Sequence, residues 1–308
     1  MGNVFEKLQD VISFVNGLNS PQTQLFFTQK SNLGYTTFAP NVSNMIKSDI
    51  LNIIIDDIDK CKNLDIVPYN PSGCKDETIE TCSIEEIGKY YEVISSFDVA
   101  DVVDTTLDPD ELTFYTLYVK DTNTGNDVYF FRRTTKFKRL HSKGFLARFS
   151  GNTLSRMDSK MLGIDGLVDV IGTKDKAFVL NHVSLERIFM MNEHYNNAAT
   201  EALNKLRIKD KILNFEQFEI DCLDDKRIQK TLTKMLNETE VFEHALEDFQ
   251  AIENTIDIFN LDIRIEESNG NKKIFYETKD NLVNILRIIR DAYYKSTVQN
   301  RLGIDESI

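Results

Sequence analysis

The sequence predicts an α+β fold: a central antiparallel sheet packed against C-terminal helices, preceded by an N-terminal region of helices and short strands. Two observations carry this prediction. Residues 113–181 alternate apolar and polar side chains between turn sequences, which is typical of antiparallel strands. The segments on either side carry apolar residues at helical spacing. A chain of 308 residues has room for one large or two modest domains.

The N-terminal region begins with a helix over residues 3–17, for which Gly17 is a suitable stop. Two short strands follow, TQLFFTQ and GYTTFAP. Asn41 and Ser43 are both suitable N-caps for a second helix that extends through Ile58. The segment from Val67 to Cys82 is predicted to be a loop, because it contains two prolines and a glycine and shows no period.

Ser83 and Glu86 have the spacing of a capping box, which predicts a helix that ends near Phe97. The run from Asp98 to Glu111 is acidic, and we place a domain boundary or a long connection in it. The predicted domains are an N-terminal α/β region, residues 1–105, and an α+β core, residues 106–308. A run of like charges is usually a solvated loop. Alternatively, it folds over the basic segment described below and limits loose binding to polyanions.

The central region reads as a meander of five or six antiparallel strands. FYTLYVK and VYFFRRT flank the turn DTNTGND, FLARFS and LSRM flank GNT, and LVDVIG and AFVLN flank TKDK. The remainder is helical except for one hairpin, IRIEE and KKIFYE, with Asn-Gly at its turn. A helix over LVNILRIIRDAYYKSTV, residues 282–298, closes the chain. These C-terminal helices are expected to cover the apolar face of the sheet.

One segment departs from the acidic character of the chain. From Val128 to Met157 there are eight basic side chains and no Asp or Glu, although the whole chain has 36 Lys and Arg against 49 Asp and Glu and a net charge of −13. Alternate residues of a strand share a face, so this basic window predicts a sheet with an apolar inner face and a basic outer face. Several cations on one surface bind a polyanion by releasing condensed counterions. The predicted nucleic-acid-binding residues are Arg132, Arg133, Lys136, Lys138, Arg139, Lys143 and Arg148.

Two other interpretations of the basic window stay open. Lys and Arg on strands also protect sheet edges from aggregation, so the window can be a solvated face. It can also meet a protein partner with an acidic surface. The absence of acids, more than the number of cations, favours an anionic ligand.

Composition indicates a cytoplasmic protein. No apolar run approaches the roughly 20 residues needed to cross a bilayer, and the first residues lack the basic region of a signal peptide. The cysteines have no zinc-binding spacing and are too few for a disulfide framework, which indicates free thiols. They are Cys61, Cys74, Cys82 and Cys222.

The sequence contains no convincing catalytic motif. The histidines have no metal-ligand or catalytic spacing, and no cofactor or metal is expected; they are His141, His182, His194 and His244. Asp262, Glu277 and Lys279 resemble the two carboxylates and lysine of metal-dependent nucleases. However, E-x-K is short and frequent, and acids there also suit a helix N-terminus. We therefore predict that the protein is not an enzyme, with a nuclease as the alternative.

The block from Lys143 to Tyr195 resembles the KwaB-like family, named for protein B of the Kiwa antiphage system. The shared features are the strand KGFLARF, then GNTLSRMD and IDGLVDVI, then a strand ending in Asn181 and the helix-opening LERIF. The tail YYKSTVQNRLGI is also similar, with Val298-Gln299 where the family has Leu-Thr. The resemblance extends from Arg132 to Gly303. Most of these motif residues suit the fold rather than a site: Asn181 is a suitable helix cap, and Leu185, Ile188 and Phe189 have the spacing of core residues.

The resemblance implies a cytoplasmic antiphage effector that binds DNA and associates with a small membrane-embedded partner subunit, which would recruit it to the inner face of the membrane. It implies no catalytic residue. We expect sequence-tolerant DNA binding by a homodimer or higher oligomer, which would block replication or transcription of foreign DNA without cutting it. The alternatives are a metal-dependent nuclease and a non-catalytic assembly scaffold.

Overall fold

The computed structural model describes residues 5–18, 21–73, 75–100, 108–134, 147–150, 153–156, 162–268 and 270–305. The chain divides into two compact units: a sheet unit, Met1–Tyr69 with Cys74–Met191, and a helical unit, Asn192–Ile308 with Asn70–Gly73. This division does not follow the predicted boundary at residue 105. The reason is strand pairing, since β1 (Gln22–Ser31) pairs along the whole of β5 (Phe114–Lys120) and places both sides of that boundary in one sheet.

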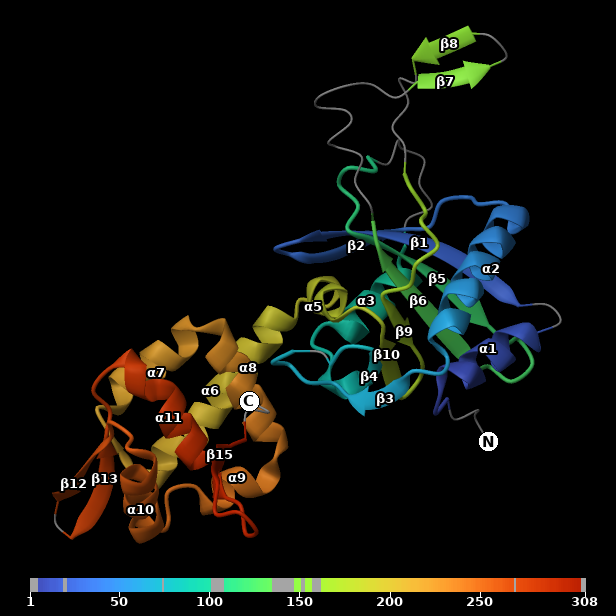
Figure 1. Cartoon of the computed structure of the whole chain (residues 1–308). Helices are drawn as coiled ribbons and strands as arrows, with labels where there is room; N and C mark the ends of the chain where they lie inside the picture. Colours follow the sequence, from blue (N-terminus) through green and yellow to red (C-terminus); the bar gives the residue numbers. More distant parts are fainter. Residues whose placement is uncertain are drawn as a thin grey trace. The chain divides into compact units, whose positions relative to one another are not determined.

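The sheet unit is built on an eight-stranded sheet with the order β2-β1-β5-β6-β9-β10-β4-β3 (Figure 1). All neighbours are antiparallel except β3 and β4, which are parallel. Besides β1 and β5, the strands are β2 (Gly34–Phe38), β3 (Asp65–Pro68), β4 (Thr78–Ser83), β6 (Asp127–Arg133), β9 (Val170–Gly172) and β10 (Lys176–Val179). The centre of the sheet, β5-β6-β9-β10, confirms the predicted antiparallel order for four strands of the meander.

Two features of the sheet correct the predictions. The predicted hairpin of β7 (Ala147–Ser150) and β8 (Thr153–Arg156) does form, but as a separate two-stranded sheet. The predicted loop from Val67 to Cys82 was wrong at both ends, where β3 and β4 lie. β4 pairs with β10. Its strand conformation therefore depends on a partner strand far along the chain, which local sequence does not reveal.

Helices cover both faces of the sheet. Helices α1 (Leu8–Asn16) and α2 (Asn44–Cys61) share one hydrophobic core with the face that carries Phe130. On the opposite face, α3 (Tyr90–Asp98), which follows a one-turn 3-10 helix (Ile84–Glu86), and α5 (His182–Ile188) surround Phe131. The ring of Phe131 lies 6.0 Å from that of Tyr90 and 5.1 Å from that of Phe189. Figure 1 shows these two helix pairs on either side of the sheet.

The helical unit contains the predicted C-terminal helices and has a hydrophobic core of its own. Its buried residues come from helices and from a three-stranded sheet of order β11-β13-β12. The helices are α6 (Met191–Lys209), α7 (Phe215–Asp224), α8 (Lys226–Asn237), α9 (Thr239–His244), α10 (Phe249–Phe259) and α11 (Lys279–Ile289). The strands are β11 (Ile212–Leu213), β12 (Arg264–Ser268), β13 (Asn271–Phe275), β14 (Tyr293–Lys295) and β15 (Leu302–Ile304). In the sheet unit, the apolar stripes of α1 and α2 pack on one face of the eight-stranded sheet.

Several local predictions are confirmed. Ser43 caps α2, and Ser83 with Glu86 forms a capping box, although a 3-10 turn rather than the helix itself follows directly. β12 and β13 form the predicted hairpin. The predicted closing helix over residues 282–298 instead ends at Ile289, because Asp291 adopts a positive φ of 53° and β14 and β15 pair beyond it. None of the described helices combines the length and apolar character that a membrane span requires.

Candidate nucleic-acid interface

The seven predicted binding residues fall into two groups. Arg132 and Arg133 end strand β6 and are described in full. Arg148 lies in β7, but its side chain is not among those that the structure describes. The other four residues lie outside the described residues: Lys136, Lys138, Arg139 and Lys143. The predicted basic outer face is not what β6 shows. Both of its faces are apolar and covered by helices, so its two arginines lie at the end of the strand.

Arg132 is held inside the protein by two carboxylates. Its Nη1 donates to Asp169 Oδ1 at 2.8 Å, its Nε donates to Asp165 Oδ1 at 3.0 Å, and its Nη2 also pairs with Asp165. The side chain of Asp169 is 1% exposed and that of Arg132 is 15% exposed. Burial alone would lower the pKa of Arg132, but these carboxylates raise it instead. The guanidinium is therefore neutralised internally and serves to fix the end of β6.

Asp169 also holds together the corner where β6 ends and where β9 and α5 begin. It does so through hydrogen bonds of its backbone and of its second carboxylate oxygen. Its Oδ2 accepts the backbone N–H of Arg133 at 2.7 Å, and its own N–H donates to Phe131 O at 2.9 Å. Its carbonyl accepts from Leu180 and Asn181, directly before α5. Asn181 then caps α5 by accepting from Ser184 N at 3.0 Å, as predicted. One buried aspartate thus connects β6, β9 and the start of α5.

The fold brings two further cations to Arg133 that the sequence did not indicate. Lys30 comes from β1 and Arg187 from the last turn of α5. Lys30 Nζ donates to the carbonyl oxygen of Arg187 at 2.8 Å across 157 residues of sequence. No local pattern marks either residue, because only the pairing of distant elements places them together.

His182, considered above for catalysis, is enclosed by acids. Its Nδ1 lies 2.7 Å from Glu80 Oε2 and its Nε2 lies 3.3 Å from Glu186 Oε1. Its ring stacks on Tyr69 at 4.9 Å. Burial alone would lower the pKa of His182, but the hydrogen bonds to Glu186 and Glu80 and their charges raise it to about 9. Both ring nitrogens are engaged, so this histidine joins β4 to α5 and offers no base to a substrate.

The raised pKa of His182 predicts a loss of stability at high pH. Because the folded pKa lies above the ordinary value of 6.5, the stabilisation is complete below about pH 6.5 and disappears as the pH rises through about 9. The amount is on the order of 3 kcal/mol. Urea unfolding of the wild type and of His182→Gln, measured across this pH range, is expected to show a difference that shrinks as pH rises. A constant difference would contradict the prediction. His244→Gln, at a site 78% exposed, is the control.

The residues of the nuclease alternative do not form a metal centre among the described residues. Lys279 Nζ lies 2.9 Å from Asp224 and 3.6 Å from Asp221, so its charge is already matched. Asp262 and Glu277 are exposed. Within the described part of the chain, no group of three or more His, Cys, Asp or Glu side chains is placed to hold a metal ion.

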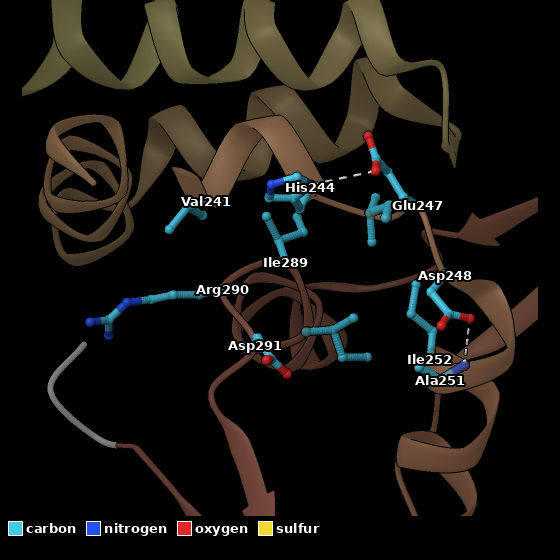
Figure 2. Close-up of a pocket in the computed structure, with 11 residues that line it drawn as sticks. Val241, His244, Glu247, Asp248, Ala251, Ile252, Ile289, Arg290 and Asp291 are labelled. Carbon is cyan, nitrogen blue, oxygen red and sulfur yellow. Dashed lines mark hydrogen bonds and ion pairs between the residues drawn. The ribbon is translucent and has the colours of Figure 1, made fainter. Parts of the chain in front are cut away.

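The helical unit contains a pocket of about 460 Å³ between α9, α10 and α11. Figure 2 shows Val241, Ile252 and Ile289 among its apolar lining, with acids around them. Two of these acids have internal roles: Glu247 pairs with His244 at 3.6 Å, and Asp248 accepts from Ala251 N at 3.0 Å as the cap of α10. The side chains of Glu247 and Asp248 therefore serve the structure of the helical unit.

The described cysteines agree with the prediction of free thiols. Cys61, Cys82 and Cys222 form no disulfide, and Cys74 lies outside the described residues. Burial raises the pKa of the Cys82 thiol to about 12, and it also raises that of Cys222. These two thiols are therefore protonated and suited to packing rather than to nucleophilic chemistry.

Comparison with protein families gives one match. The model of the family described as "Kiwa protein KwaB-like" matches residues 112–299. No curated protein and no solved structure matches the chain. The matched region includes β5, β6, β9, β10 and α5, and hence the corner organised by Asp169, and it continues through most of the helical unit. Because it covers more than half of the chain, the chain belongs to the KwaB-like family of the Kiwa antiphage defence system.

Proposed function

We propose that this protein is an antiphage defence effector that binds DNA without sequence preference. The observation that carries the proposal is the basic window, Val128 to Met157, which is free of carboxylates in a chain with a net charge of −13. Phosphate contacts by Lys and Arg release counterions and give affinity that depends on local rather than total charge. Family membership supports the defence role.

Six of the seven predicted residues carry the proposed contacts. Arg132 is already paired with Asp165 and Asp169, so its contribution is to hold β6 in place. The six others are Arg133, Lys136, Lys138, Arg139, Lys143 and Arg148. Arginine contributes bidentate hydrogen bonds to phosphate oxygens, and lysine contributes a mobile point charge.

The proposed mode of action is occupancy. DNA covered by a homodimer or higher oligomer would not be replicated or transcribed, and no step requires cleavage. Family membership supports a defence system of more than one subunit. We propose that the other subunit is small and membrane-embedded and that it holds the protein at the cytoplasmic face of the membrane. Both the oligomer and this partner belong to the proposal.

A gel-shift experiment with a duplex of about 30 base pairs, over about 50 to 200 mM salt and with or without Mg²⁺, tests the proposal. We expect binding that falls steeply with salt, does not need Mg²⁺ and leaves the duplex intact. Cleavage that requires Mg²⁺ and is lost in Glu277→Gln would establish the nuclease alternative instead. Neither binding nor cleavage, together with co-purification with a membrane protein, would identify an assembly scaffold.

A further inference from the structure

Three cations from three elements meet where β6 ends. We call Lys30, Arg133 and Arg187 the cation cluster. Lys30 and Arg133 share one face of the sheet, because Lys30 follows Phe26 and Thr28 at alternate positions of β1, and Arg133 follows Phe131 in β6. This is the face covered by α5, whose last turn carries Arg187.

Hydrogen bonds fix Lys30 of the cation cluster against the end of α5. Lys30 Nζ donates to Arg187 O at 2.8 Å, and Tyr35 of β2, opposite Lys30, donates its hydroxyl to Ile188 O at 2.7 Å. The carbonyl oxygens at the end of α5 would repel an anion, but these two already accept hydrogen bonds. An ammonium has three N–H donors, so the bond to Arg187 leaves Lys30 with capacity for a ligand.

In the described part of the chain, the cations of this cluster form no ion pair with an acid, although the charge of Asp169 acts on Arg133. Among the described residues, no carboxylate lies within ion-pair distance of Lys30, Arg133 or Arg187. The side chain of Asp169, the acid nearest in the structure to the Arg133 backbone, is occupied by Arg132 and that N–H. Burial and then the charges of Arg133 and Arg187 lower the pKa of Lys30. Burial and then the charge of Arg187 likewise lower the pKa of Arg133.

Like charges held together cost stability, and a bound anion removes that cost. Arg187 is exposed, and Lys30 and Arg133 are half-buried, so the cluster is open to solvent yet partly desolvated. We propose that Lys30, Arg133 and Arg187 form a binding site for a phosphate group. Where that phosphate belongs to a DNA backbone, the inference rests on the proposed function and adds Lys30 and Arg187 to the interface. A free phosphate uses the same chemistry.

Arg187→Gln tests the site most cleanly, because it removes an exposed charge and leaves the backbone carbonyl that holds Lys30. Full-length protein is titrated into a fluorescent duplex over a salt series. We expect Arg187→Gln to weaken binding about eightfold near 0.1 M salt and to reduce the salt slope by about 0.9, which is the value for one phosphate contact. Arg133→Gln is expected to lower the DNA affinity and the salt slope to a similar extent. Arg187→Lys, which keeps the positive charge, is expected to retain most of the salt slope. Arg227→Gln, which removes an exposed helical arginine of α8, is the matched control.

A second experiment distinguishes a phosphate of DNA from free phosphate. It also distinguishes failure of the phosphate site from failure of the proposed function. The melting temperature of each protein is measured with inorganic phosphate and, at equal ionic strength, with chloride. DNA binding by the wild type with an unchanged salt slope in Arg187→Gln and Arg133→Gln would overturn the site and leave the proposed function standing. If the wild type binds no DNA, stabilisation by phosphate that Arg187→Gln abolishes would support a site for free phosphate. If the wild type binds no DNA and inorganic phosphate does not stabilise it, the proposed phosphate site is overturned.

Discussion

Replacement of Asp169 by asparagine is expected to lower the free energy of unfolding of the sheet unit by about 3 kcal/mol. The carboxylate is 1% exposed and accepts from the Arg132 guanidinium and the Arg133 backbone. Asparagine has almost the same shape, so packing is retained while the charge is lost. Arg132 would keep only Asp165, and its partly buried charge would no longer be fully balanced.

Hydrogen exchange of the β6 and β9 amides, together with urea unfolding followed by circular dichroism, measures this effect. Asp165→Asn is the control, because Asp165 contacts the same guanidinium but is 33% exposed. Asp165→Asn is expected to lower the free energy of unfolding by about 1 kcal/mol, which is the upper end of the range for an exposed ion pair. Equal losses in the two variants would show that burial of Asp169 does not matter. The helical unit, which has its own core, should keep its exchange pattern in both.

Charge reversal of Lys136, Lys138 and Arg139 to glutamate is expected to weaken DNA binding by at least about 100-fold near 0.1 M salt. Each lost phosphate contact removes roughly a factor of eight at that salt concentration, and three together remove several hundredfold. The introduced carboxylates add repulsion. The salt slope should fall by about 2.7, which is the contribution of three contacts.

The matched control reverses three cations elsewhere, Lys174, Lys226 and Arg227, all of them exposed. It changes the net charge by the same amount, so it isolates the position of the charges from their number. Fluorescence anisotropy on one duplex, with both variants at several salt concentrations, makes the comparison. Equal weakening in the two variants would mean that total charge rather than the basic window controls binding, and the window would then be a solvated face.

Features that depend on neighbours in the sequence were predictable, whereas features that depend on distant contacts were not. Short-range patterns were sufficient for the hairpins β5-β6, β9-β10 and β12-β13, because a turn sequence and the alternation beside it lie within a few residues. The same holds for the caps at Ser43 and Asn181. Family resemblance was also readable, since it lies in the spacing of motifs along the chain.

What the sequence determined alone is thus the α+β class, the local elements of the meander and the presence of a basic window without acids. The tertiary structure decided which helices cover the sheet and that β3 and β4 extend it. It also decided that Arg132 forms an ion pair with Asp169, while Lys30 and Arg187 lie near Arg133. The physical reason is that charge balance depends on distance in space. Residues 30, 133 and 187 are remote along the chain, and only strand pairing and helix docking set the distances between them.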